Sequence, residues 1–204
     1  MRDLREMTVS ELTLRTWSKS PTPGGGSISA LVGSLAAALT GMASNLSQGE
    51  ARTVAEEMDG LRIQMLAAMQ EDAEFFSQYM MALSMPKNTE EEKETRRITM
   101  QNCIKQAAEA PLRVAESLVS LFGTIETVIR YGNPNLITDA LIAAMLARTA
   151  ILSAVLNVKI NLVNIQDEAF EKRVQDRISE LECAALNGEN AVLSLSELSV
   201  VRRT

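Results

Sequence analysis

Apolar residues recur every three or four positions over most of the chain, which is the spacing of amphipathic α-helices. Within residues 50–85 this pattern falls on Met58, Leu61, Met65 and Met69. No segment shows the apolar–polar alternation of a strand, and neither an internal repeat nor a low-complexity linker divides the 204 residues. The pattern therefore predicts one all-α domain over residues 1–204.

Local start and stop signals divide this domain into a bundle of about six helices. Thr8 and Thr89 are each followed three residues later by a glutamate, which is the spacing of a capping box. In Gly132-Asn133-Pro134 the glycine ends one helix, and the next two residues cap and start another. Pro111 predicts a kink or a short interruption of its helix. The predicted helices cover residues 9–19, 27–47, 50–85, 89–130 and 134–163, and Asn164 with Asp167 opens the last.

The helix expected over residues 27–47 carries no charge and follows a Pro/Gly-rich loop, residues 20–27. Small residues such as Gly33 and Gly41 form a smooth stripe along it that lets another helix approach closely. It is poor in Leu, Ile and Phe, so we expect a helix buried in a bundle or an oligomer rather than a membrane span. If Ser27 caps this helix, free N–H groups beside bare glycines form a seat for an anion. A flexible loop is the alternative.

Composition and charge exclude several kinds of site. The net charge is -6 and no basic cluster offsets it, which argues against nucleic acid as a partner. The chain has no histidine, so acid–base chemistry falls to carboxylates, lysine, tyrosine, backbone or water. Cys103 and Cys183 are too few for a four-ligand zinc site, and no metal site is predicted. We expect both to be reduced in a cytoplasmic protein, since the N-terminus lacks the apolar run of a signal peptide.

Several polar residues stand where helix periodicity or an apolar context makes them candidates for chemistry. Asp139, Asn157 and Asn161 fall on one predicted apolar helix. The first two are five turns or about 27 Å apart, so only an elongated ligand or a site shared between subunits would use both. Structural roles, as a charge at a helix start or as bonds to neighbouring helices, explain them equally. Asp72 also fits a solvated acidic face, and Lys87-Asn88 an ordinary loop.

Four segments follow one another in a fixed order along the chain. They are SPTPGGGSISALVGSLAAAL (20–39), MPKNTEEEKETRR (85–97), YGNPNLITDALIAA (131–144) and LNVKINLVNIQDEAF (156–170). Together they resemble the formiminotetrahydrofolate cyclodeaminase domain, which some bacteria use as a methenyltetrahydrofolate cyclohydrolase. The similarity covers about the whole chain.

This resemblance implies an all-helical homodimer that acts on a tetrahydrofolate derivative without a metal, nucleotide or other cofactor. The cyclodeaminase closes 5-formiminotetrahydrofolate to 5,10-methenyltetrahydrofolate and releases ammonia, whereas the cyclohydrolase hydrolyses the methenyl compound to 10-formyltetrahydrofolate. By match to the family's motifs, Asp139 is the first candidate for the acid–base residue and Asp72 is the second. The implied substrate-binding residues are Pro23, Gly24, Gly25, Gly26, Ser27, Lys87, Asn88, Asn133, Asn157 and Asn161.

One segment departs from the family's pattern. Where the family typically has a glycine followed by basic residues and an aromatic, this chain has Gly49-Glu50-Ala51-Arg52-Thr53. If that stretch grips the acidic tail of folate, tail binding is weaker here or the ligand differs. The alternative hypothesis is therefore a non-catalytic, oligomeric helical bundle that binds a small anion.

Overall fold

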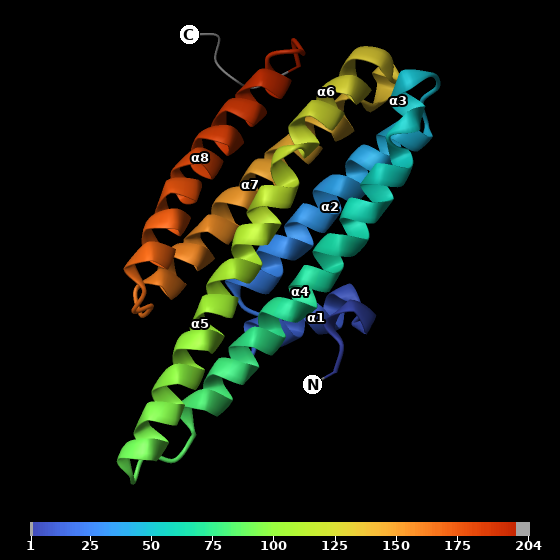
Figure 1. Ribbon diagram of the computed structural model, residues 1–204. Coiled ribbons are helices and arrows are strands. Elements are labelled where there is room, and N and C mark those ends of the chain that lie inside the picture. The colour runs from blue at the N-terminus through green and yellow to red at the C-terminus, as the bar shows by residue number, and fades with distance from the viewer. Residues whose placement is uncertain (1, 199–204) are drawn as a thin grey trace.

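Five long helices lie side by side in an elongated bundle in the computed structural model, which describes residues 2–198 (Figure 1). They are α2 (Gly25–Asn45), α4 (Ala55–Leu83), α5 (Glu90–Val119), α7 (Ile137–Leu162) and α8 (Glu168–Leu193). The shorter elements are η1 (Leu4–Glu6), α1 (Val9–Trp17), α3 (Glu50–Thr53), α6 (Leu121–Tyr131) and η2 (Pro134–Leu136). The described residues contain no strand, so the all-α prediction is confirmed.

The six predicted helical regions are all present, but two of them are divided at positions that the sequence did not indicate. The region 50–85 breaks at Val54 into α3 and α4, and the region 89–130 breaks at Ser120 into α5 and α6. Of the two outcomes predicted at Pro111, the short interruption is wrong, because α5 continues through this residue, and the kink stays a prediction. Asn164 does not open the last helix; the Asp167 side chain caps α8 by accepting the N–H of Phe170 at 3.0 Å.

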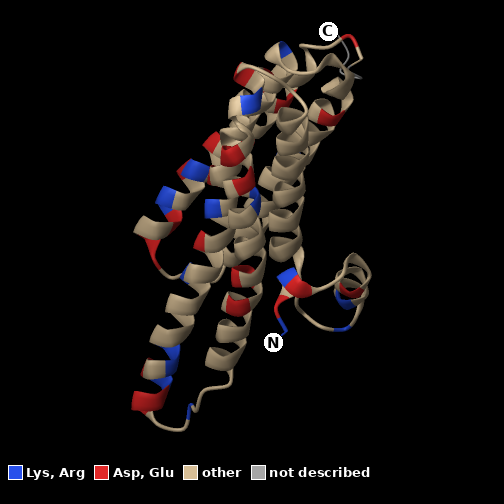
Figure 2. Cartoon of the chain, turned by 90° about the vertical axis from the view of Figure 1, so that its right-hand side faces the viewer, with Lys and Arg blue, Asp and Glu red and all other residues tan. Residues whose placement is uncertain are grey.

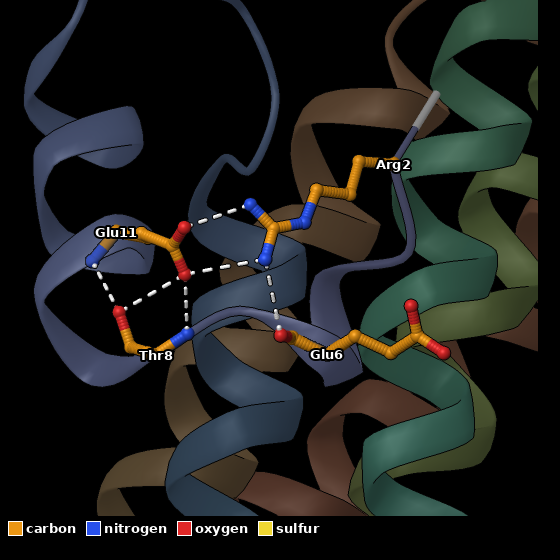
Figure 3. Close-up of polar contacts among 4 residues, drawn as sticks. All are labelled: Arg2, Glu6, Thr8 and Glu11. Atoms are coloured by element: carbon orange, nitrogen blue, oxygen red, sulfur yellow. Dashed lines mark hydrogen bonds and ion pairs between the residues drawn. The ribbon is translucent and has the colours of Figure 1, made fainter.

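Both predicted capping boxes are confirmed. At the start of α1 the Thr8 hydroxyl accepts the N–H of Glu11, and the Glu11 carboxylate accepts the N–H of Thr8 (Figure 3). Arg2 adds an ion pair to Glu11 at 2.8 Å. The hydrogen bond from Arg2, followed by those from Thr8, lowers the pKa of Glu11 to about 2. The three-residue spacing of Thr8 and Glu11 therefore sets the start of α1. This short helix lies outside the bundle of long helices (Figures 1 and 2).

The small-residue helix α2 lies inside the bundle, as predicted, and packs chiefly against α4 and α7. A Cβ added at Gly33 would lie 2.7 Å from a methyl carbon of Leu118, and one at Gly41 would lie 3.3 Å from the Cβ of Met58. The missing side chains thus allow α4 and α5 to approach α2 closely. Antiparallel α2 and α7 are joined at one end by the Asn133 N–H, which donates to the Ser47 hydroxyl at 2.9 Å.

Two helices are long and apolar enough to cross a membrane by length and composition alone, α2 and the segment 134–162. In the bundle, 61% and 50% of their most apolar windows are buried. Core helices of a bundle show such burial, and the exposed part of α7 leaves an apolar surface.

Candidate active site

The carboxylate of Asp72, on α4, lies at the N-terminus of α2. The Ser27 hydroxyl donates to Asp72 Oδ2 at 2.7 Å, and the Ser27 backbone N–H also bonds this carboxylate. The N-cap residue of α2 is Gly24, which has no side chain to bond the first N–H groups. Asp72 therefore fills the role of a capping side chain from a neighbouring helix. The hypothesis that Ser27 caps α2 is wrong, since Ser27 is the third residue of that helix.

Gly26 makes this arrangement possible. A Cβ at this position would lie 2.0 Å from Asp72 Oδ1 and 2.6 Å from Asp72 Cγ, so no larger residue leaves space for the carboxylate. The glycines thus permit the close approach that the sequence predicted. The group that approaches is the protein's own anion, and the predicted anion seat is occupied by Asp72.

Burial raises the pKa of Asp72 above its ordinary value of 3.8, and the hydrogen bonds from Ser27 offset part of this effect. No Lys or Arg within the described residues pairs with this carboxylate. A carboxyl group that is desolvated, hydrogen-bonded and unpaired is suited to exchanging a proton with a ligand.

Asp72 faces a pocket of about 320 Å³ that four helices and the Pro/Gly-rich loop enclose. This volume is at the low end of the range for small-molecule sites. A larger hollow of about 540 Å³ between α7 and α8 contains none of the predicted site residues. The pocket is lined by Pro21, Thr22, Gly24, Gly25, Asp72, Phe76, Ala107, Asn157, Ile160 and Asn161.

The two asparagines of the pocket are each held by a backbone carbonyl. Asn161 Nδ2 donates to the carbonyl of Ala107, on α5, at 2.8 Å, and Asn157 Nδ2 donates to the carbonyl of Ser153 at 2.8 Å. Asn157 also lies against the start of α2, because a Cβ at Gly25 would be 3.2 Å from both the oxygen and the nitrogen of its amide. The bonds fix both amides at the pocket wall, where each keeps an oxygen and a second N–H for a ligand.

Other predicted site residues lie elsewhere in the chain. Asp139 is in the first turn of α7, about 27 Å along that helix from Asn157. Asn133 binds the end of α2, since its Nδ2 donates to the Leu46 carbonyl at 3.4 Å. Lys87 and Asn88 are exposed in the loop between α4 and α5, at the far tip of that hairpin (Figure 1). One chain therefore brings together only part of the predicted set.

The predicted residues that meet at the pocket are Asp72, Gly24, Gly25, Asn157 and Asn161, with Gly26 and Ser27 beneath the carboxylate and Pro23 buried in the adjoining loop. Sequence reasoning missed Phe76 and Ile160. Phe76 follows Asp72 by four residues and Ile160 follows Asn157 by three, so helical spacing from these polar candidates was the signal for both. Residues 2–198 contain no group of three or more Cys, Asp or Glu side chains placed to hold a metal ion.

Comparisons with known proteins agree with this fold. The family model described as formiminotransferase-cyclodeaminase matches residues 8–180. The methenyltetrahydrofolate cyclohydrolase of Methylorubrum extorquens is 36% identical over 81% of this chain and 82% of the relative. The formimidoyltransferase-cyclodeaminase of Rattus norvegicus is 30% identical over 86% of this chain but 35% of the relative, so this chain spans about a third of its length.

A solved structure, that of formiminotetrahydrofolate cyclodeaminase from Thermotoga maritima, matches with a TM-score of 0.83 and 28% identity. The match covers 94% of this chain and 96% of the other. The resemblance that four sequence segments indicated is thereby confirmed, and the chain belongs to the formiminotransferase-cyclodeaminase family.

Proposed function

We propose that this protein is a folate one-carbon enzyme that forms or hydrolyses 5,10-methenyltetrahydrofolate. The observation that carries the proposal is the partly buried carboxyl group of Asp72, unpaired with any described cation, at a pocket lined by two amides. The relatives' names support the folate chemistry and favour it over a non-catalytic bundle.

The pocket suits a flat heterocycle with polar edges. Phe76 and Ile160 supply apolar surface, while Asn157 and Asn161 supply amide oxygens and N–H groups. In our proposal the pterin ring packs against the apolar pair and bonds the amides through its edge. The reacting carbon between N5 and N10 then lies near Asp72.

In the cyclodeaminase reaction, N10 attacks the formimino carbon and gives a tetrahedral carbon that bears an amino group. Asp72 accepts the proton that N10 loses and donates it to the amino group. The C–N bond breaks, ammonia leaves, and the methenyl cation remains. The same carboxyl group thus serves as base and then as acid, which requires a pKa closer to neutrality than that of a solvated aspartate.

In the cyclohydrolase reaction, a water molecule attacks the methenyl carbon while Asp72 accepts a proton from it. The proton passes to N5 as the bond between N5 and the carbon breaks, and 10-formyltetrahydrofolate and one proton are the products. The ionised carboxylate also stabilises the cationic substrate before attack. Neither sequence of proton transfers uses a metal or a nucleotide. We assign the acid–base role to Asp72 rather than to Asp139 because, of the two, only Asp72 lines the pocket with Asn157 and Asn161.

A homodimer is part of the proposal because one face of α2 and α7 exposes large apolar side chains. This α2/α7 face consists of Leu35, Met42, Leu46, Ile142, Leu156, Ile160 and Val163. Ile160 belongs both to this face and to the pocket, so a second copy bound there would cover the pocket. If the two α7 helices pair antiparallel, the partner's Asp139 end of α7 faces the pocket, which reconciles the motif-based candidates with Asp72.

The experiment that tests the function follows methenyltetrahydrofolate by its near-ultraviolet absorbance. Absorbance that grows from 5-formiminotetrahydrofolate identifies the cyclodeaminase, and decay of the methenyl compound above the buffer rate identifies the cyclohydrolase. If the protein is a folded dimer and changes the absorbance in neither assay, the proposed function is contradicted.

A further inference from the structure

Asn161, one of the two amides of the pocket, lies in the last turn of α7. The final carbonyls of a helix lack partners within it, so this turn opens easily unless the chain beyond it is held. Residues 163–167, which follow α7, contain no glycine to form a capping motif. The position of the Asn161 amide therefore depends on what holds the turn between α7 and α8.

One side chain of α5 holds this turn, residues 163–167, which lies beside that helix (Figure 1). Gln101 Nε2 donates to the Asn164 carbonyl at 2.9 Å, and Gln101 Oε1 accepts the backbone N–H of Gln166 at 2.8 Å. Between these two residues Ile165 is buried in the core. The turn is thus attached to α5 by its backbone and to the core by its apolar side chain.

A second contact fixes the register of the turn against α5. Lys105 follows Gln101 by four residues and forms an ion pair with Asp167 at 2.6 Å. Asp167 caps α8, and the ring of Phe170 lies 5.6 Å from Lys105 Nζ. The end of α7 and the start of α8 are therefore both placed by one face of α5.

The same helix contacts Asn161 directly. The Ala107 carbonyl accepts Asn161 Nδ2 at 2.8 Å, and Ala107 lines the pocket. Gln101 and Ala107 are six residues, or about 9 Å, apart on α5, so they hold the chain at Asn161 and just beyond it. With both contacts present, the amide offers its oxygen and its second N–H to a ligand in one orientation.

We propose that Gln101 is a positioning residue of the active site, which acts on the substrate through Asn161. Gln101 itself is not among the residues that line the pocket. The inference rests on the proposed function and deepens it, because it assigns a role in substrate binding to a side chain outside the pocket. Loss of this side chain weakens binding and leaves the proton transfers at Asp72 unchanged.

The test is a double-mutant cycle of Q101L and N161A in the full chain, with kcat and KM measured for each variant. Q101L is expected to raise KM by about 2- to 12-fold, the equivalent of one hydrogen bond, and to leave kcat within about two-fold. In the N161A background the same substitution should change KM by less than about 1.5-fold, because no amide remains to be oriented. An equal rise of KM in both backgrounds, or a fall of kcat at unchanged KM, would overturn the proposal.

Q64L is the matched control. Gln64 of α4 also joins a neighbouring helix, since its Nε2 donates to Ser117 Oγ on α5 at 3.0 Å, but neither residue lines the pocket that contains Asp72. Both kcat and KM should stay within about two-fold in Q64L. If Q64L raised KM as much as Q101L does, the effect would be a general loss of rigidity, and the positioning role would be refuted.

A second readout needs no substrate. Amide hydrogen exchange of residues 159–162 measures how often the last turn of α7 opens. Q101L should speed this exchange by at least about five-fold, the low end of the range for two hydrogen bonds, and Q64L should leave it unchanged. Absence of turnover in the wild type would refute the proposed function, whereas unchanged exchange in Q101L would refute the positioning role whether or not the wild type turns over.

Discussion

The side-chain amide of Asn161 in α7 donates to the backbone carbonyl of Ala107 in α5 at 2.8 Å. Ala107 precedes Pro111 by four residues, so its carbonyl is the one that lacks a helical N–H partner where proline interrupts the hydrogen-bond ladder. A neighbouring helix thus supplies the missing donor, and α5 continues through the proline. The same bond fixes Asn161 at the pocket wall.

We expect N161L to lower the free energy of unfolding by about 1–3 kcal/mol, because it leaves the Ala107 carbonyl without a partner. In a P111A background the new N–H of residue 111 bonds that carbonyl, so the N161L substitution should cost less than about 1 kcal/mol. Urea unfolding of the four chains of this cycle gives the coupling. Equal losses in both backgrounds would refute the pairing.

Substituting Gly26 should displace Asp72, since a Cβ would lie 2.0 Å from its Oδ1. We expect G26A to lower the free energy of unfolding by about 1–3 kcal/mol. In a D72A background the obstacle is gone, and alanine, the better helix former, should be neutral or stabilising by up to about 1 kcal/mol. Thermal unfolding of both pairs measures this; a loss that persists in the D72A background would locate the strain elsewhere.

The roles of the two aspartates are separated by turnover. D72N is expected to lower kcat by about 100- to 10,000-fold, the range for losing a general acid–base group, with the fold retained by circular dichroism. D139N, in the first turn of α7, is the matched control and should keep kcat within about ten-fold if its role is to orient substrate across subunits. Full turnover of D72N would remove Asp72 from the mechanism.

The raised pKa of Asp72 predicts a pH dependence of stability. The native state holds this proton more tightly than the unfolded state, so the group's contribution to stability falls as pH rises above its ordinary value of 3.8. A ten-fold difference in proton affinity between the two states corresponds to about 1.4 kcal/mol of unfolding free energy. The difference in unfolding free energy, wild type minus D72N, should therefore decrease as pH rises above about 3.8 and through the raised native-state pKa.

The control for this measurement is internal. Glu11 and Asp3 have pKa values lowered to about 2 by their arginine partners, and their contributions are lost only as pH falls toward that value. Both chains share these groups, so their effects cancel in the difference. A difference that does not vary with pH would show that Asp72 titrates normally.

Disruption of the α2/α7 face should yield monomers. L156D places a charge in the proposed dimer contact and is expected to weaken association at least about 100-fold, since an unpaired buried charge costs several kcal/mol. L186D alters an exposed leucine of α8 outside that face and should leave the dimer intact. Sedimentation at micromolar concentration reports the masses; a dimer that survives L156D would place the contact elsewhere.

The sequence predicted best what depends on neighbours in the chain. The capping boxes at Thr8 and Thr89 need only a glutamate three residues on, and both occur. The path of α5 through Pro111 was not predictable, because the donor that permits it comes from another helix. For the same reason the partner of the α2 N-terminus could not be identified as Asp72.

The site was predictable in part. Helical spacing selected Asn157 and Asn161 as a pair, and both line the pocket. Phe76 was missed because an aromatic residue on an apolar helix face has the appearance of core. The choice between Asp139 and Asp72 depends on which carboxyl group the fold buries against glycine, and no local pattern contains that information.

The pocket is assembled from segments near both ends of the chain, since Gly25 and Asn157 meet across it. During synthesis α2 and α4 emerge long before α7, and until α7 docks the wall that shields Asp72 does not exist. In such a partial chain Asp72 is an ordinary solvated carboxylate with ordinary acidity. The raised pKa that the proposed mechanism requires of Asp72 is therefore acquired only when α7 docks, and α7 ends about eighty residues after α4 in the chain.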